Sequence, residues 1–167
     1  MKKTKLVLLP VILTVLTACS PAVVKRAELV NVGTYSSQDT YQAKAESVIG
    51  GVIQYGKDVV FTSGETRVPA RKGEQFGLQY VLYGEPSASF VTVTEILLHP
   101  TVIDPTTGIT RTKSSRQKEI RLGYESKPNM LGYGFDHDWE VVPGEWIFQV
   151  AYQGEIVVEQ AFTVYEE

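Results

Sequence analysis

The sequence predicts an all-β sandwich of about seven or eight antiparallel strands. Beyond its first 27 residues the chain is rich in Val, Thr, Tyr and Phe, and turn-forming residues interrupt it about every ten positions. No stretch there has the apolar periodicity of a long amphipathic helix, which argues against an α/β fold with a parallel sheet.

Alternation of apolar and polar residues places the individual strands. In the segment QFGLQYVLYG, for example, Phe76 and Leu78 fall on the same face. A change of phase inside FVTVTEILLHP predicts a β-bulge near Thr94 or Glu95. Only the segment 39–47 has the composition of a helical turn. The expected strands are 28–35, 48–55, 58–62, 75–83, 90–98, 118–124, 145–152 and 156–165.

The last two expected strands form a hairpin around Gln153 and Gly154. Their apolar faces carry Trp146, Phe148, Val150 and Tyr152 on the first strand and Ile156, Val158, Phe162 and Val164 on the second. A two-residue loop with regular pairing would place Glu159 opposite Phe148 on the apolar face, because paired residues share one side of a sheet. The sequence therefore predicts one extra residue, either as a bulge or, as the better fit, in a three-residue loop from Tyr152 to Gly154.

This closing hairpin resembles that of immunoglobulin-like and fibronectin-like domains of exported bacterial proteins. Three segments also resemble an uncharacterised family of bacterial secreted proteins: RVPARKGEQFGLQYVLYG (67–84), LLHP with the following DPTTG (97–108), and FDHDWEVVPGEWIFQV (135–150). The resemblance implies export and an immunoglobulin-like sandwich, and it implies no activity.

The N-terminus has the layout of a secretory signal peptide, with three lysines before a short apolar run. The run is too short to span a membrane, which takes roughly 20 apolar residues. Its end, Leu16-Thr17-Ala18-Cys19, resembles the lipobox of bacterial lipoproteins and contains the single cysteine of the chain. This resemblance implies cleavage between Ala18 and Cys19 and a diacylglycerol on the Cys19 thiol. The expected organisation is a signal peptide over 1–18, a lipidated tether over 19–27 and the sandwich over 28–167.

A lipidated Cys19 leaves no thiol for a disulfide, so the domain is expected to rely on its core alone. By the same resemblance, Ser20 implies sorting to the outer membrane, facing the periplasm, if the host is Gram-negative. Loss of the three signal-peptide lysines from a chain of 16 basic and 19 acidic residues leaves a net charge of −6. That charge argues against nucleic acid as a partner, and it makes the lipid the expected attachment to the membrane.

The segment GFDHDWE gathers Asp136, His137, Asp138 and Glu140, which are potential ligands of a divalent cation. The alternative is a polar turn next to a buried Trp139. An extended segment would place the two aspartates on one face and His137 with Trp139 on the other. That separation divides the ligands, so the sequence predicts no tight metal site.

A basic run offers a second candidate partner surface. It comprises Arg111, Lys113, Arg116, Lys118 and Arg121. Such a run suits an acidic protein or an anionic envelope polysaccharide, or it is simply a solvated loop and the outward face of a strand. The candidate partner surface as a whole is Asp136, His137, Asp138, Trp139, Arg111, Lys113 and Arg116.

The sequence indicates no catalytic residues and no cofactor. The chain has two histidines and no Gly-x-Ser-x-Gly motif. The sequence therefore argues against a Ser-His-acid catalytic triad. The expected function is a non-enzymatic binding or structural module that is held to the cell envelope by lipid, with an unknown envelope protein or polysaccharide as partner. The alternative is a metal- or carboxylate-dependent hydrolase of envelope material.

Overall fold

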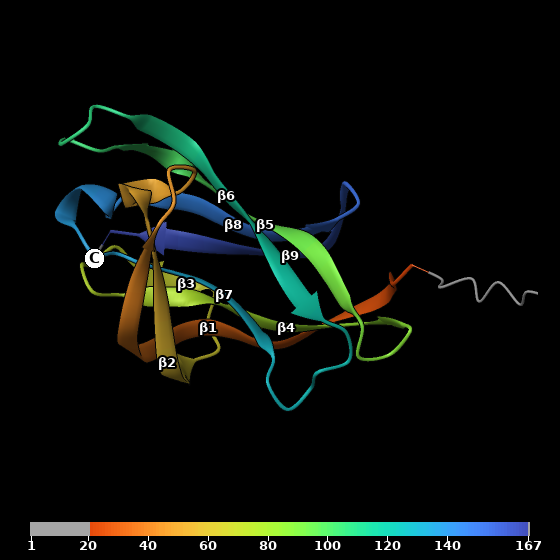
Figure 1. The fold of residues 1–167 in the computed structure, drawn as a ribbon. Coiled ribbons are helices and arrows are strands. Elements are labelled where there is room, and N and C mark those ends of the chain that lie inside the picture. The colour runs from red at the N-terminus through yellow and green to blue at the C-terminus, as the bar shows by residue number, and fades with distance from the viewer. Residues whose placement is uncertain (1–20, 167) are drawn as a thin grey trace, which may run out of the picture.

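The computed structural model describes residues 21–166, which form two packed β-sheets (Figure 1). The all-β sandwich expected from the sequence is confirmed, with nine strands in the described range instead of seven or eight. One sheet has the order β2 (Val52–Ser63), β1 (Val23–Lys44), β4 (Gln75–Glu85), β7 (Asn129–Gly134). The other has the order β3 (Arg67–Pro69), β9 (Glu155–Tyr165), β8 (Gly144–Tyr152), β5 (Phe90–Ile103), β6 (Thr110–Arg121). All pairs are antiparallel except β3 with β9.

A cluster of aromatic rings fills the space between the sheets. Phe76 on β4 lies at its centre, with the ring of Trp146 at 5.8 Å and that of Phe162 at 5.4 Å, both fully buried. The indole of Trp146 donates a hydrogen bond to the carbonyl of Val142 at 3.0 Å, so its polar group is satisfied inside the core. These residues come from the alternating faces that the sequence indicated, and they bind the two sheets together without a disulfide.

The β8–β9 hairpin has the extra residue that the apolar faces required, but it lies in a bulge. Gln153 and Gly154 form a two-residue turn with φ of 52° and 89°, the signs of a type I′ turn. Val150 pairs with Val158, whereas Ala151 pairs with Ile156, so one residue of β9 bulges out between them. The three-residue loop is therefore wrong. Because the bulge reverses the alternation at the turn, Ile156 is exposed and not on the buried face.

Several strand boundaries differ from the sequence-based expectation. The expected strand 48–55 is wrong at its start, where 49–51 form a 3₁₀ helix, and its remainder joins 58–62 in the single strand β2. Strand β1 continues through residues 39–44, where a helical turn was expected. Residues 23–27 of the expected tether belong to β1. The strands β3 and β7 were not anticipated, and β6 begins at Thr110, eight residues before the expected start, because its polar sequence gives no apolar alternation.

The bulge expected near Thr94 or Glu95 is wrong. Strand β5 pairs with β6 in unbroken register from Phe90 to Leu98, and the irregularity falls only after Leu98. Glu95 continues the inward face of β5 and is buried. The apparent change of phase arose because a carboxylate occupies a core position.

A hairpin formed by the second half of β1 and by β2 extends the first sheet. The first half of β1 pairs with β4, and its second half, from Thr34 onward, pairs with β2. We call residues 34–63 the β1–β2 arm; it crosses over the side of the sandwich (Figure 1). At its tip, Ser47 exchanges hydrogen bonds with the backbone of Ser115 on β6, at 2.7 and 3.2 Å. The arm thereby connects the β2 edge of the first sheet with the β6 edge of the second sheet.

The remaining regular elements are two 3₁₀ helices, η1 (Ile49–Gly51) and η2 (Asp138–Glu140). In the described range, no helix has the length and apolar character that crossing a membrane requires. The signal peptide and Cys19 lie outside the described residues, so their assignment stays a prediction.

The turn at Gln153 offers a test of the hairpin. A glutamine is costly at positive φ, whereas asparagine tolerates that conformation. Gln153→Asn should raise the free energy of unfolding by about 0.5 kcal/mol, measured by urea denaturation. The β-branched variant Gln153→Val should lower it. Equal stability of the two variants would contradict a left-handed residue at this position.

Candidate functional site

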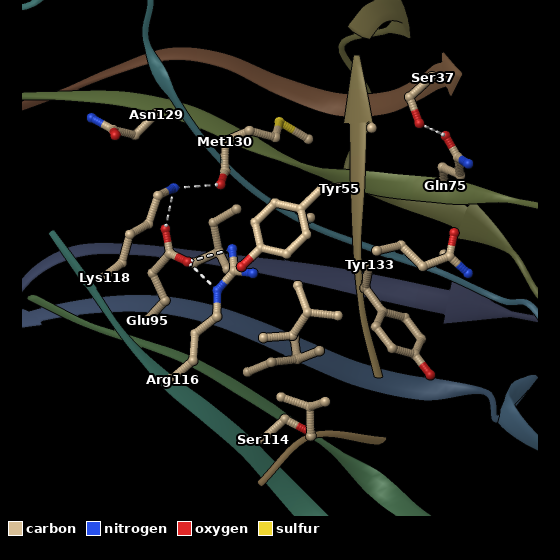
Figure 2. Close-up of a pocket in the computed structure, with 18 of the residues that line it drawn as sticks. Ser37, Tyr55, Gln75, Glu95, Ser114, Arg116, Lys118, Asn129, Met130 and Tyr133 are labelled. Atoms are coloured by element: carbon tan, nitrogen blue, oxygen red, sulfur yellow. Dashed lines mark hydrogen bonds and ion pairs between the residues drawn. The ribbon is translucent and has the colours of Figure 1, made fainter. Parts of the chain in front are cut away.

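A cavity of about 570 Å³ lies between the sheets, on the side where the edge strands β6 and β7 meet (Figure 2). The strands β5, β6 and β7 form its walls, and the β1–β2 arm covers it. The ammonium of Lys118 donates to the carbonyl of Met130 at 3.2 Å, so a side chain of β6 bridges to the edge of β7. The cavity therefore depends on three segments that are distant in the sequence.

A buried carboxylate organises one end of this cavity. Glu95 is 1% exposed and accepts three hydrogen bonds: from the hydroxyl of Tyr80 at 2.9 Å, from Nε of Arg116 at 2.6 Å and from Nζ of Lys118 at 2.9 Å. We call these four residues the Glu95 cluster. Burial and the adjacent Glu95 raise the pKa of Tyr80 well above its usual range, so the phenol stays protonated and donates.

The Glu95 cluster carries one positive charge in excess, because two cations share a single carboxylate. The side chains of Arg116 and Lys118 remain 23% and 29% exposed and line the cavity. Both Nε and one terminal nitrogen of Arg116 bind the same oxygen of Glu95, so this carboxylate does not engage the other terminal nitrogen. The guanidinium lies 6.0 Å from the ring centre of Tyr55 on the arm. Glu95 therefore occupies one edge of the guanidinium, and the rest of the group lies at the cavity wall.

Apolar side chains from both sides line the middle of the cavity. The arm contributes Ile49, Val52 and Ile53, and the sandwich contributes Leu97 and Leu131. Ligand sites in proteins are mostly apolar cavities of this size with a few placed polar groups.

The other end of the cavity is acidic. Tyr133 lies there with a buried hydroxyl that no well-formed hydrogen bond reaches within residues 21–166. Burial, and then the nearby carboxylates of Glu140 and Asp136, raise the pKa of Tyr133. Asp136 accepts a hydrogen bond from the amide of Gln54 on the arm. This contact fixes the arm at the acidic end.

The segment from Asp136 to Glu140 is a capped turn and not an extended strand. Glu140 is buried, and its carboxylate accepts hydrogen bonds from the backbone N–H groups of Asp136 and His137 at 2.8 and 2.9 Å. Burial raises the pKa of Glu140, although these two bonds oppose the shift. The expected division into faces is wrong, because His137 is exposed and stacks on the partly buried Trp139, with ring centres 5.6 Å apart.

The candidate ligands in this segment point in different directions. Asp136, His137 and Asp138 are exposed, whereas Glu140 is committed to capping. Within residues 21–166, no group of three or more His, Cys, Asp or Glu is close enough to hold a metal ion. His99, the other histidine, is buried and stacks on Trp146 with ring centres 5.3 Å apart. Burial lowers the pKa of His99 and keeps the imidazole neutral.

The basic run does not form one surface. Arg116 and Lys118 face inward to Glu95, so an outward orientation for that part of β6 is wrong for both residues. Lys113 is exposed. Arg111 donates to the carbonyl of Glu46 on the arm and lines a second, smaller cavity of about 390 Å³ beside η1, together with Trp139.

Sequence reasoning missed Glu95 as a site residue, and it placed Lys118 in the basic run without its partner. The signal was present, because Val91, Val93, Glu95 and Leu97 form one inward face if alternation is continued through the charge.

The two-sheet sandwich defines the chain as an immunoglobulin-like domain. It superposes with a TM-score of 0.59 on the crystal structure of an immunoglobulin-like protein from Pseudomonas aeruginosa, with 22% identity, covering 89% of this chain and 99% of that one. A family model described as a domain of unknown function, DUF3859, matches residues 23–164, and the chain belongs to this family. A search of curated proteins gives no match.

Removal of the buried carboxylate tests the Glu95 cluster. Glu95→Ala leaves two neighbouring, partly buried cations and the Tyr80 hydroxyl without an acceptor. We expect the free energy of unfolding to fall by about 3–5 kcal/mol, measured by urea denaturation. Glu119→Ala, which removes an exposed carboxylate from the same strand as the two cations, should change it by less than about 0.5 kcal/mol. A similar loss in both variants would contradict the assigned role of Glu95.

Proposed function

We propose that the protein is a lipid-anchored module of the cell envelope that binds a small molecule in the cavity between its sheets, without catalysing a reaction. The observation that carries this proposal is the cavity itself. Its volume of about 570 Å³ falls within the range of ligand sites, and its wall combines apolar side chains with charged groups at both ends.

The state of the buried acids near the cavity supports binding over hydrolysis. The carboxylate of Glu95 is held by two cations and a phenol, and that of Glu140 by two backbone N–H groups. Acid–base catalysis needs a carboxyl group that can reach the substrate and exchange a proton with it. These two carboxylates are engaged in holding the fold.

The position of the N-terminus supports an anchored orientation. The hydroxyl of Tyr152 donates to the carbonyl of Ala22 at 2.8 Å, which ties the start of the chain to the sandwich. A lipid on Cys19 would then be separated from Ala22 by a link of at most about 10 Å. The β1–β2 arm lies at the opposite end of the sandwich from residue 21 (Figure 1). Anchoring would therefore hold the arm away from the membrane.

The anchor is tested by Cys19→Ala in the full-length chain. Without the thiol, no diacylglycerol can be attached, so metabolic labelling with a radioactive fatty acid should be lost. The protein should leave the membrane fraction, because stable attachment takes two acyl chains or a second membrane-binding signal. Unchanged labelling and fractionation would contradict a lipid anchor at this cysteine.

The cavity is tested with Nile red, a neutral dye whose fluorescence rises in apolar surroundings. The domain from residue 20 onward should increase its fluorescence saturably. Ile53→Trp adds bulk at the cavity wall from the arm and should lower the dye's affinity about tenfold, since a filled cavity leaves less room. Val60→Trp is the matched control, because Val60 is exposed on the same strand, β2, and does not line the cavity.

Two outcomes would contradict a binding cavity. One is the absence of saturable binding by the unmodified domain. The other is an equal effect of the two tryptophan variants, which would place the dye elsewhere on the protein.

A further inference from the structure

We propose that the cavity ligand is an amphipathic anion, whose carboxylate or phosphate head binds Arg116 and whose apolar body lies between the arm and the sandwich. This inference rests on the proposed binding function and specifies its ligand class. Three features of the cavity favour such a ligand: the excess charge of the Glu95 cluster, the part of the Arg116 guanidinium that Glu95 does not engage, and the apolar side chains nearby.

The charge of the Glu95 cluster favours an anion. Glu95 supplies one negative charge against the positive charges of Arg116 and Lys118. The excess charge lies at a cavity wall where both cations are less than one-third exposed, so water screens it less than at an open surface. A ligand carboxylate or phosphate would neutralise this charge, whereas a cationic ligand would add to it.

The geometry identifies Arg116 as the group that holds the head. Lys118 already bridges Glu95 and the carbonyl of Met130. Arg116 uses Nε and one terminal nitrogen on a single oxygen of Glu95, which leaves the other terminal nitrogen with its N–H donors. Figure 2 shows this guanidinium between Glu95 and the ring of Tyr55. A guanidinium held in place by one carboxylate is pre-organised to bind a second anion.

The apolar wall sets the nature of the ligand body. Next to the Glu95 cluster, the cavity is bounded by Ile49 and Ile53 from the arm and by Leu97 and Leu131 from the sandwich. These four side chains bury a chain or ring of carbon atoms favourably. Polar side chains such as Ser114 and Gln117 also line the cavity, so its wall suits a body that is mainly, though not wholly, apolar.

The acidic end fixes the direction of the ligand. Asp136 and Glu140 line the cavity near Tyr133, which Figure 2 places on the far side from the Glu95 cluster. A second anionic group on the ligand would meet these carboxylates, and like charges repel. The ligand is therefore a molecule with an anionic group at one end only, and that end lies at Arg116.

Competition against Nile red measures this preference in the domain from residue 20 onward. Decanoate and decanol have similar apolar chains and differ in the head group, and monodecyl phosphate adds the second anionic head. At pH 7.5, decanoate should displace the dye with an affinity about tenfold or more above that of decanol, because a charge-assisted hydrogen bond to Arg116 is added. The relative affinities of decanoate and monodecyl phosphate identify which head group the site prefers.

Substitutions locate the head group. Arg116→Gln and Lys118→Gln each bring the Glu95 cluster to neutrality, and both should reduce the advantage of decanoate over decanol, with the larger loss in Arg116→Gln. Lys113→Gln removes an exposed cation from the same strand, outside the cavity, and should leave the advantage unchanged. Circular dichroism and thermal melts establish that each variant is folded.

The outcomes separate the two proposals. If the unmodified domain binds the dye but decanol competes as well as either anion, the anionic ligand class is wrong and the binding cavity stands. If the domain binds no dye, the binding cavity is wrong as well. An equal loss in Lys113→Gln would attribute the preference to overall charge and would overturn the role of Arg116. The first two outcomes do not depend on folding of the variants at position 116 or 118, because the unmodified domain alone decides the preference.

Discussion

The burial of one carboxylate constrains the open side of this sandwich. Glu95 occupies a core position on β5, and a charge at such depth is tolerated only with partners that offset its lost hydration. Its partners come from two other strands: Tyr80 on β4, and Arg116 and Lys118 on β6. Tyr80 belongs to the first sheet and the two cations to the second, so the Glu95 cluster joins the sheets by polar contacts at the edge where the aromatic core ends. The same arrangement leaves a positive charge in excess beside the cavity.

The molecule combines two kinds of packing. Around Phe76 the sheets are held by aromatic rings at 5.4 to 5.8 Å, with no polar group unsatisfied on Trp146. Toward β6 and β7 the sheets are separated by a cavity, and the β1–β2 arm closes it through contacts at Ser47 and Gln54. The first part explains a stable immunoglobulin-like domain without disulfides. The second part is held by polar contacts near the surface and by Ile49 of the arm, which is buried against the sandwich and donates its backbone N–H to the hydroxyl of Ser114.

The DUF3859 family and the similar Pseudomonas aeruginosa structure identify the fold of this chain. They do not identify a ligand, which has to be inferred from the side chains that line the cavity. The acidic turn around Asp136 drew attention in the sequence because four potential ligands crowd together. In the structure the one buried carboxylate of this turn, Glu140, accepts hydrogen bonds from two backbone N–H groups. Its role is therefore to stabilise the turn. The polar groups that face the cavity are spread along the chain, and they meet only because β6, β7 and the arm converge.

The sequence by itself determined the sandwich and the need for an extra residue in its closing hairpin, but not the register of that hairpin. Alternation and the matching of apolar faces are local properties, and they required an extra residue between β8 and β9 before its location in a bulge was known. Local patterns did not determine which side of a polar strand is buried. In β6 the inward-facing cations Arg116 and Lys118 are paired with the carboxylate of Glu95, about twenty residues earlier in the chain. The cavity likewise required tertiary structure, because the free energy of burying a charge or covering a cavity depends on residues that only the complete fold brings together.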